Sequence, residues 1–365
     1  MKQDMFEIGG EFSLPTKYLC STKINQIDQY VNYSSKLFLS SGRGCLRLLA
    51  KAMRTGQDNE VLLPSYLCEE IIKPFTEELF EVKFYRVNEE LDVDLNDLRQ
   101  KINKKTRTVL FINYFGFPQP MAHEIKALCG DTTFLIEDLV QSFLTQSNGK
   151  PIGFIGDATI SSYRKWIPIP DGALLGINNS QLHLSLTEVL PYQKHYVETR
   201  LRGLELKGDY LNRAASKKSF REMFASAESM LDSTPFKMSN SSKTMLVKYD
   251  FKSIIDQRRE NFLFLLSRFW SSKQVKPLYQ KLPSGICPLG FPVITKKRSH
   301  LKKLLIANRI YPPIHWSLVE AIDKKEFPDS WSISKHILTI PIDQRYNKED
   351  MQFIADVLNK FEAVP

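Results

Sequence analysis

The run SSYRKWIPIPDG, residues 161–172, is the stretch on which the interpretation of this chain depends. It places Lys165 between a short strand-like segment and a turn rich in proline and glycine. Upstream, Asp138 ends the hydrophobic run FLIED at residues 134–138, and the turn SGRG at residues 41–44 separates a strand-like segment from a helix-like one. A lysine, a carboxylate and a glycine turn therefore each occur where a strand is expected to end.

Short apolar runs alternate with helix-like segments from about residue 35 to residue 176. We expect β-strands at seven runs: Lys36–Ser40, Val61–Leu63, Val82–Tyr85, Thr108–Asn113, Thr133–Glu137, Thr159–Ser162 and Ala173–Gly176. We expect helices between some of them, at Leu46–Met53, Cys68–Phe75, Leu95–Ile102 and Ala122–Cys129. Because parallel strands need crossover connections, which helices supply, the alternation predicts an α/β fold with a mostly parallel seven-stranded sheet.

The second half of the chain has a different pattern. Residues 182–233 are polar and helix-like with few strand signals, which predicts that they lead the chain away from the sheet. Strand-like runs return at Gly290–Thr295 and His336–Pro341, and Asn347–Phe361 carries one apolar stripe at helical spacing. These features predict a second, smaller α/β portion.

Length and composition indicate a globular protein with two domains. A chain of 365 residues can bury a large core, and we place a large domain with an N-terminal arm at residues 1–240 and a smaller domain at residues 241–365. Apolar residues at 42% and charged residues at 25% are ordinary for such a protein. No stretch of about 18 apolar residues exists, so no membrane span is expected. The first residues contain acids and no apolar core, so no signal peptide is expected.

The balance of charge says little about macromolecular partners. The 50 basic and 41 acidic side chains leave a formal charge of +9. Basic clusters at residues 101–105, 217–221 and 296–303 lack interleaved aromatic repeats. We therefore expect solvated faces with a mild attraction for small anionic molecules, and no nucleic-acid partner.

Cysteine and histidine usage argues against disulfides and metals. The chain has five cysteines, an odd number, with no CxxC pair, and its histidines show no metal-binding spacing. We expect neither a disulfide framework nor a metal site, and a reducing cytoplasmic location fits this usage best.

Lys165, Asp138 and the turn at residues 41–44 together match the needs of pyridoxal 5′-phosphate (PLP). Its pyridine nitrogen needs an anion, its aldehyde an amine that forms a Schiff base, and its phosphate a helix N-terminus. Each feature also has an ordinary interpretation: Asp138 as a cap of the next helix, Lys165 as a surface lysine, and the turn as a plain strand-to-helix connection. The three gain weight together because phosphate turn, aspartate and lysine follow in that order.

Further positions around these groups complete the predicted cofactor site. Gln141, three residues after the aspartate, is placed to reach the 3-oxygen of the ring. Gly42 and Gly44 allow the backbone to approach a phosphate closely, and Arg43 between them adds a charge and a fork of donors. Ser162, three residues before the lysine, is a further phosphate donor.

The chain resembles the fold-type I PLP-dependent enzymes, and within them the DegT/StrS-type sugar aminotransferase family, over most of its length. The elements that carry the resemblance are FEIGG at residues 6–10, SGRGCL at 41–46, VLLPSY at 61–66, EDLVQ at 137–141, the lysine loop at 156–172 and ILTIP at 337–341. The lysine loop and the EDLVQ element are the more specific matches.

The resemblance implies a PLP-dependent aminotransferase that forms a homodimer with active sites at the subunit interface. It implies that Lys165 holds the cofactor and moves the proton, and that Asp138 tunes the ring. It also implies that a donor such as glutamate gives its amino group to a keto-sugar linked to a nucleotide. Two alternatives stay open. One is a PLP-dependent lyase or dehydratase, and the other is a ligand-sensing or scaffold protein that keeps the fold without turnover.

Three positions depart from the family pattern. Arg43 stands where the family usually has threonine or serine, and Lys165 lies two residues closer to Asp157 than the family spacing puts it. Cys68 stands where an aromatic residue normally stacks on the cofactor ring. Near the C-terminus, Arg345 is either a bidentate holder of a substrate carboxylate or a structural residue in a turn.

Overall fold

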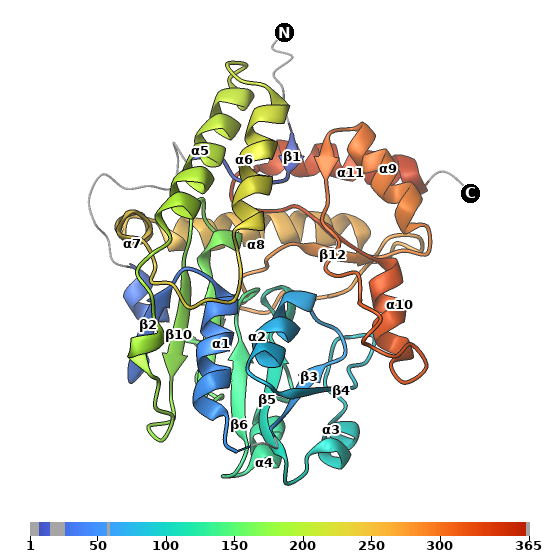
Figure 1. Cartoon of the computed structure of the whole chain (residues 1–365). Helices are drawn as coiled ribbons and strands as arrows, with labels where there is room; N and C mark the ends of the chain where they lie inside the picture. Colours follow the sequence, from blue (N-terminus) through green and yellow to red (C-terminus); the bar gives the residue numbers. More distant parts are fainter. Residues whose placement is uncertain (1–6, 15–25, 57–58, 363–365) are drawn as a thin grey trace.

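The core of the molecule is a seven-stranded sheet (Figure 1). The computed structural model describes residues 7–14, 26–56 and 59–362. The seven strands are β2 (Ser35–Leu39), β3 (Glu60–Pro64), β4 (Glu81–Tyr85), β5 (Thr106–Ile112), β6 (Phe134–Asp138), β9 (Ala158–Ser162) and β10 (Ala173–Ile177). Their order is β2-β10-β9-β6-β5-β3-β4, with β10 antiparallel to both neighbours and the remaining pairs parallel. The seven expected strands and the mostly parallel sheet are confirmed.

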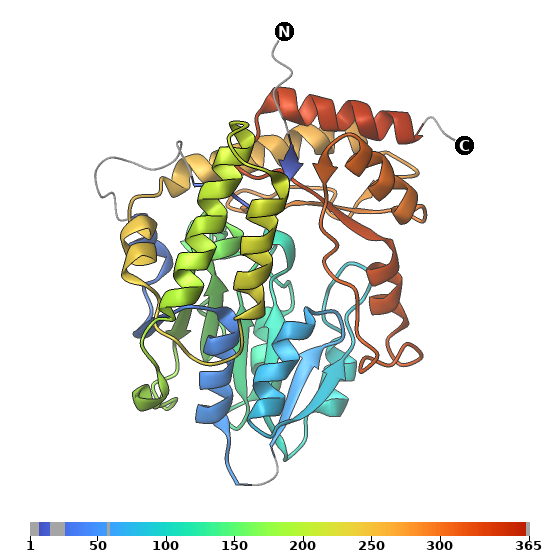
Figure 2. The ribbon, with the colours of Figure 1, turned by 45° about the horizontal axis from the view of Figure 1, so that its top comes forward.

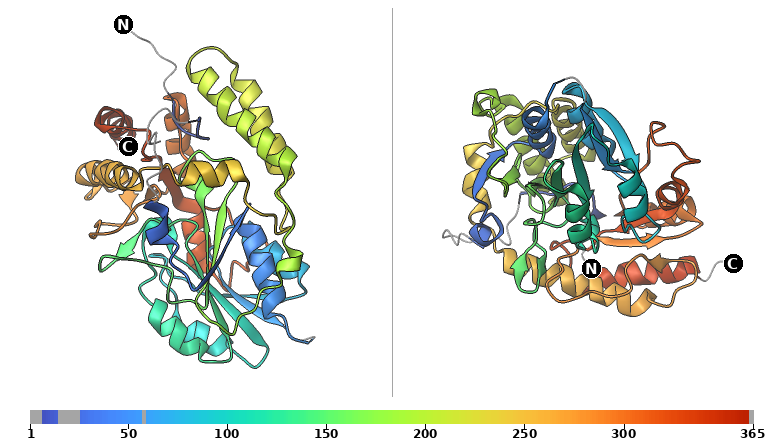
Figure 3. Two further views of the ribbon diagram at one scale, coloured as in Figure 1. Left: turned by 90° about the vertical axis from the view of Figure 1, so that its left-hand side faces the viewer. Right: turned by 90° about the horizontal axis from the view of Figure 1, so that it is seen from below.

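Helices cover this sheet, as the alternation of the sequence predicted. α1 (Gly42–Met53) and α2 (Ile72–Glu77) pack together, and the left view of Figure 3 shows the sheet between them and the pair α3 (Leu95–Lys101) and α4 (Ala122–Cys129). The helix expected at Cys68–Phe75 begins instead as a 3-10 turn, η2 (Glu69–Ile71), and then continues as α2. Because both faces are covered, the central strands are buried along almost their whole length.

A hairpin of two helices, α5 (Lys194–Leu211) and α6 (Lys217–Ser229), projects from the sheet (Figures 1 and 3). It falls within the segment 182–233 that the sequence predicted to be helical. The two helices approach closely at Gly203, where a Cβ would lie 2.9 Å from the ring of Phe224. The last turn of α6, at Glu228, lies at the same edge of the sheet as the strand-end residues Asp138 and Ser162.

The C-terminal part forms a smaller α/β unit. Its antiparallel sheet holds β11 (Lys276–Pro277), β12 (Phe291–Ile294) and β14 (Ile337–Ile340). Its helices are α8 (Phe251–Phe269), α9 (Arg298–Ala307) and α11 (Lys348–Glu362), and Figure 2 shows α8 and α11 side by side. Two further helices, α7 (Asn240–Leu246) and α10 (Pro328–His336), bury Leu246 and Ile333 in clusters with residues of the seven-stranded sheet. The two strands and the terminal amphipathic helix expected here are confirmed.

The first described residues join this C-terminal part. β1 (Ile8–Gly9) pairs in parallel with β13 (Ile310–Tyr311), and Ile8 is buried in the hydrophobic cluster of the C-terminal unit. The same described segment also contacts the α5–α6 hairpin, where Phe12 packs in one cluster with Leu204 and Glu7 pairs with Lys207. The assignment of the N-terminal arm to the large domain stays a prediction.

Short elements complete the described chain. They are the 3-10 turns η1 (Gln26–Tyr30), η3 (Tyr114–Gly116), η4 (Tyr163–Lys165) and η5 (Leu186–Glu188), and the hairpin of β7 (Gln146–Ser147) and β8 (Lys150–Pro151). Among the described helices, none has the length and apolar character needed to cross a membrane. The chain leaves β2, β6 and β9 at one edge of the sheet, which is where open α/β sheets bind their ligands.

Candidate active site

Two adjoining cavities lie at this edge of the sheet. The inner cavity, of about 190 Å³, is formed by the first turn of α1, the ends of β6 and β9, and Trp316. The outer cavity, of about 550 Å³, lies between the N-terminal segment, α5, α6 and the C-terminal part. Arg164, Lys165 and Glu228 line both. Lys165 therefore stands at the junction of two compartments.

The predicted cofactor residues, with one exception, line the inner cavity: Gly42, Arg43, Asp138, Gln141, Ser162 and Lys165. The exception is Gly44. Its amide donates to Oγ of Ser41, the N-cap of α1, at 3.1 Å, and a Cβ at this position would lie 3.1 Å from Pro235 Cα. Close packing against Pro235 requires a small residue here, and the contact of Gly44 with a phosphate stays a prediction.

Asp138 ends β6 with its carboxylate buried. The residue is 3% exposed, and its Oδ1 accepts a hydrogen bond from the Val140 amide at 2.7 Å. Burial raises the pKa of Asp138 to about 6, while the Val140 bond and the positive charge of Lys165 oppose the rise. Residues 139–144 contain turns and no helix, so Asp138 closes a turn and is not a helix cap.

Gln141 carries a buried donor that the fold does not use. Its Oε1 accepts from the Phe115 amide at 2.8 Å, which fixes the side chain. Its Nε2 is buried and has no acceptor among the residues that the structure describes. An unpaired buried donor costs free energy, so a ligand acceptor in the inner cavity would relieve it.

Lys165 is an exposed side chain on a fixed backbone. Ser162 ends β9 immediately before the turn η4 and is 8% exposed. After the lysine, Trp166 is fully buried, donates from its indole to the Val140 carbonyl at 3.1 Å, and accepts at its own carbonyl from Gln344 Nε2 at 2.6 Å. The segment around the lysine is thereby held while its amine reaches both cavities.

Ion pairs occupy the α1 end of the inner cavity. Arg43 Nε lies 2.8 Å from Glu70 Oε2, and Arg43 Nη2 lies 3.0 Å from Glu228 Oε1. Glu228 also reaches Arg164, at 3.6 Å, and Arg43 Nη1 donates to the Leu231 carbonyl at 3.3 Å. The Arg43 guanidinium is therefore at the cavity wall, but a phosphate arriving there would have to compete with Glu228.

The outer cavity is rich in positive charge. Its wall holds six basic side chains, Arg164, Lys165, Arg200, Arg258, Lys302 and Arg345, and three acidic ones, Glu11, Glu228 and Asp343. An excess of three positive charges favours an anionic ligand.

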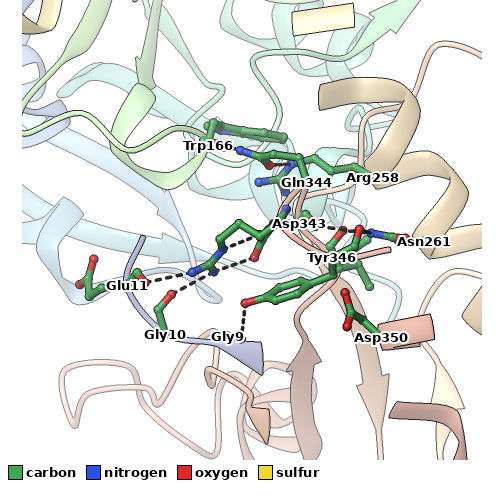
Figure 4. A network of polar contacts seen from close by, with 12 residues as sticks. Gly9, Gly10, Glu11, Trp166, Arg258, Asn261, Asp343, Gln344, Tyr346 and Asp350 are labelled. Atoms are coloured by element: carbon green, nitrogen blue, oxygen red, sulfur yellow. Dashed lines mark hydrogen bonds and ion pairs between the residues drawn. The ribbon is translucent and has the colours of Figure 1, made fainter. Parts of the chain in front are cut away.

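Arg345 fastens the N-terminal segment at the wall of this cavity, and Figure 4 shows Gly10, Glu11 and Asp343, the residues that it contacts. Its Nε and Nη2 pair with the two oxygens of Asp343 at 2.7 and 2.9 Å. Its Nη1 and Nη2 donate to the carbonyls of Glu11, at 2.9 Å, and Gly10, at 3.1 Å. Since these bonds occupy the guanidinium fork, the structural interpretation of Arg345 is supported over a bidentate grip on substrate.

The loop after β14 links this fastening to the lysine segment. Gln344, which donates to the Trp166 carbonyl, accepts from Arg258 Nε at 2.8 Å, and Tyr346 Oη accepts from the Gly9 amide at 2.6 Å (Figure 4). One short loop thus holds both the N-terminal segment and the backbone beside Lys165.

Two residues of the site, His315 and Trp316, received no role from the sequence. Burial lowers the pKa of His315 to about 3, with the charge of Lys165 adding to the effect, so the imidazole is neutral near pH 7. Its Nδ1 lies 3.0 Å from Thr339 Oγ1. Only the proline-rich run before them marks this loop in the sequence, and nothing local places it beside the lysine. Within the described ranges, no group of three or more His, Cys, Asp or Glu side chains is arranged to hold a metal ion.

Comparisons with known proteins agree with this architecture. A family model described as the DegT/DnrJ/EryC1/StrS aminotransferase family matches residues 25–359. GDP-perosamine synthase from Vibrio cholerae is 28% identical over 148 residues, which is 40% of this chain and 40% of that protein. GDP-4-keto-6-deoxy-D-mannose 3-dehydratase from Yersinia pseudotuberculosis is 26% identical over 143 residues, 37% of this chain and 36% of that protein. The chain thus spans about two fifths of the length of these curated relatives.

A solved structure extends the likeness to the whole fold. Helicobacter pylori PseC, described as an aminotransferase involved in the biosynthesis of pseudoaminic acid, matches with a TM-score of 0.70 and 15% identity. The match covers 98% of this chain and 100% of that one, so the two proteins share their fold throughout.

Proposed function

This chain belongs to the DegT/DnrJ/EryC1/StrS aminotransferase family, and on that premise we propose that it transfers an amino group from an amino acid to a keto-sugar. PLP is the cofactor of this family's aminotransferases. The donor resembles glutamate, and the acceptor is a keto-sugar or a related small carbonyl compound.

The juxtaposition of three groups in the inner cavity supports the proposal most strongly. A buried carboxylate (Asp138), an unpaired buried amide donor (Gln141 Nε2) and a primary amine (Lys165) lie around one small cavity. Each matches a different part of PLP: the ring nitrogen, the 3-oxygen and the aldehyde. The N-terminus of α1, at Gly42, opens on the same cavity and suits the phosphate.

When bound, PLP withdraws electrons from the carbon that carries the amino group. Asp138 would hold a proton on the ring nitrogen, and the positive charge there would oppose the rise that burial causes in the pKa of Asp138. Lys165 would bind the cofactor at its aldehyde carbon and move the proton at the substrate α-carbon. Gly42, Arg43 and Ser162 would contact the phosphate.

The outer cavity is the proposed substrate compartment. Its positive charge would attract an anionic substrate, and the neutral imidazole of His315 adds a group without charge beside Lys165. The N-terminal segment held by Arg345 would help to exclude water from the reacting atoms.

A dehydratase that also uses PLP is the second candidate. The likeness to the Yersinia dehydratase favours keeping it, because the name of that enzyme gives a keto-sugar linked to a nucleotide as its substrate. A fold that senses or scaffolds without turnover stays a third, separate hypothesis.

Absorbance of the purified protein with PLP tests the proposal. We expect a visible band that shifts when an amino donor is added, followed by an aminated sugar when a keto-sugar is supplied. A sugar that loses water and gains no nitrogen would support the dehydratase. A protein that binds PLP and never responds to donors or sugars would support the sensor or scaffold.

We further infer a homodimer in the cytoplasm. The described cysteines Cys45, Cys68, Cys129 and Cys287 are free thiols, which suits a reducing compartment, whereas Cys20 lies outside the described residues. Light scattering after size exclusion measures the dimer directly, and a monomer at micromolar concentration would contradict it.

A further inference from the structure

At the position where the family resemblance leads us to expect an aromatic residue in the inner cavity, this chain has Cys68. Cys68 lines the cavity and is half-buried. A thiol is small and polarizable, but it offers no flat π-face to a planar ring. A planar heteroaromatic ligand would therefore find little stacking surface at this position.

Trp316 is the one aromatic side chain among the described residues that line the inner cavity. It comes from the loop between β13 and α10, far along the chain from Cys68. Its indole packs with Tyr66, at 5.6 Å between ring centroids, and with Tyr114, at 6.3 Å. These two rings are themselves buried, so they form a firm backing for the indole.

The backbone of this loop is fastened on both sides of Trp316. Ser334 Oγ donates to the Trp316 carbonyl at 2.9 Å and accepts from the Leu318 amide at 3.2 Å. Tyr66 Oη donates to the His315 carbonyl. The indole is thus positioned by contacts to α10 and to the segment after β3, and its place at the cavity does not depend on a bound ligand.

The indole N–H distinguishes Trp316 from two other tryptophans of the fold. Buried tryptophans usually pair their N–H. Trp166 donates to the Val140 carbonyl at 3.1 Å, and Trp331 donates to the Ile322 carbonyl at 2.9 Å. Trp316 has no such acceptor among the described residues, although it is partly buried.

We propose that Trp316 covers one face of the cofactor ring, in the role that Cys68 cannot fill. The proposal rests on PLP binding in the inner cavity, as argued above. It makes Trp316 a positioning residue supplied by the C-terminal part of the fold, so that cofactor affinity depends on how this part packs against the sheet.

Equilibrium dialysis of the apo-protein against PLP, followed by PLP absorbance, tests the role without using activity. Trp316→Leu should weaken PLP binding about three- to tenfold, whereas Trp316→Phe, which keeps a flat ring, should stay within about twofold of the wild type. Trp331→Phe is the matched control, since Trp331 does not line the cavity, and it should bind as the wild type does. Circular dichroism of each apo-variant checks folding.

Fluorescence gives a second readout. PLP should quench the emission of the wild type, and Trp316→Phe should lose more of this quenching than Trp331→Phe does. Unchanged PLP affinity in a folded Trp316→Leu, or an equal loss in Trp316→Phe, would overturn the role of Trp316 while leaving the proposed function intact. A wild-type protein that does not bind PLP would overturn both.

Discussion

The inner and outer cavities each contain a buried aspartate, but the pKa is raised in the inner cavity and lowered in the outer one. Burial raises the pKa of Asp138 in the inner cavity, and the charge of Lys165 only moderates the rise. Burial also acts on Asp343 at the outer cavity, but the charge and hydrogen bonds of Arg345 outweigh it and lower the pKa. At the outer cavity the fold itself supplies a partner for the buried aspartate, whereas the inner cavity leaves a carboxylate and an amide donor for a ligand to satisfy. Buried polar groups without protein partners are typical of an active site.

The largest effect is expected from Lys165, which stands between the two regions. Lys165→Ala should abolish turnover and the visible cofactor band, because the only amine at the junction of the described cavity walls is removed. The fold should persist, since the Lys165 side chain is exposed. Assays of transamination alongside thermal denaturation check both, with the exposed Lys360→Ala as control. Residual turnover near the wild-type rate would break the comparison.

Removing the charge that satisfies the outer cavity should destabilise the fold. Arg345→Ala leaves Asp343 buried without its partner and releases the N-terminal segment, and we expect a loss of about 3 kcal/mol in the free energy of unfolding. Denaturant unfolding measures it. Arg202→Ala, which breaks an exposed pair with Glu205, should cost no more than about 0.5 kcal/mol. Equal effects from the two variants would show that Arg345 does not fasten the segment.

The free energy of unfolding of the apo-protein should depend on pH because Asp138 is buried. A folded pKa of about 6, above the unfolded value, means that the folded state favours the protonated acid. Its contribution to stability is therefore fully present below the unfolded pKa and is lost as pH rises from about 4 to about 6. Asp138→Asn should remove this slope and leave the apo-variant more stable than the wild type at pH 8, by about 3 kcal/mol. If unfolding of the wild type and of Asp138→Asn showed the same dependence on pH, the raised pKa of Asp138 would be contradicted.

With PLP bound, the substitution that stabilises the apo-protein should slow the reaction. Asp138→Asn takes away the anion opposite the ring nitrogen, so the rate should fall on the order of 10²-fold, as when a key electrostatic stabiliser is removed. Single-turnover measurements separate this loss from cofactor affinity. A near-normal rate would mean that Asp138 serves only to close the turn at Val140.

Arg43 should affect cofactor binding through the phosphate, although its guanidinium already has carboxylate partners. We expect Arg43→Ala to weaken PLP binding by about 1.5–3 kcal/mol, with little dependence on salt if the phosphate site is buried. Titration of the apo-protein with PLP gives the value. Arg47→Ala, on the same helix but paired with Glu77 and Glu78, should leave binding unchanged. An unchanged dissociation constant in Arg43→Ala would leave phosphate binding to the helix N-terminus alone.

Local signals sufficed for the sheet and for the strand-end residues of the inner cavity, but not for Trp316, which also lines that cavity. Apolar runs bounded by turn residues predicted the strands, and strand ends then placed Asp138, Ser162 and Gly42 at one edge. The antiparallel direction of β10 was not predicted, because direction depends on pairing rather than on pattern. The packing of Pro235 against Gly44 was not predicted either, because it joins two distant segments of the chain.

The outer cavity could not be predicted, because contacts between distant segments build it. The sequence left Arg345 open between a carboxylate holder and a structural residue, and only its bonds to Gly10 and Glu11 favour the structural role. His315 and Trp316 sit in a loop whose position depends on the packing of the C-terminal part against the sheet. No local periodicity carries that information.

Borohydride reduction of the PLP-loaded protein, followed by peptide mapping, tests the central claim most directly. The claim is that Lys165 is the amine that holds the cofactor at the junction of the two cavities. We expect the reduced cofactor on the peptide that contains Lys165 and on no other peptide. A label on a different lysine, or no label in a protein that binds PLP, would contradict the account.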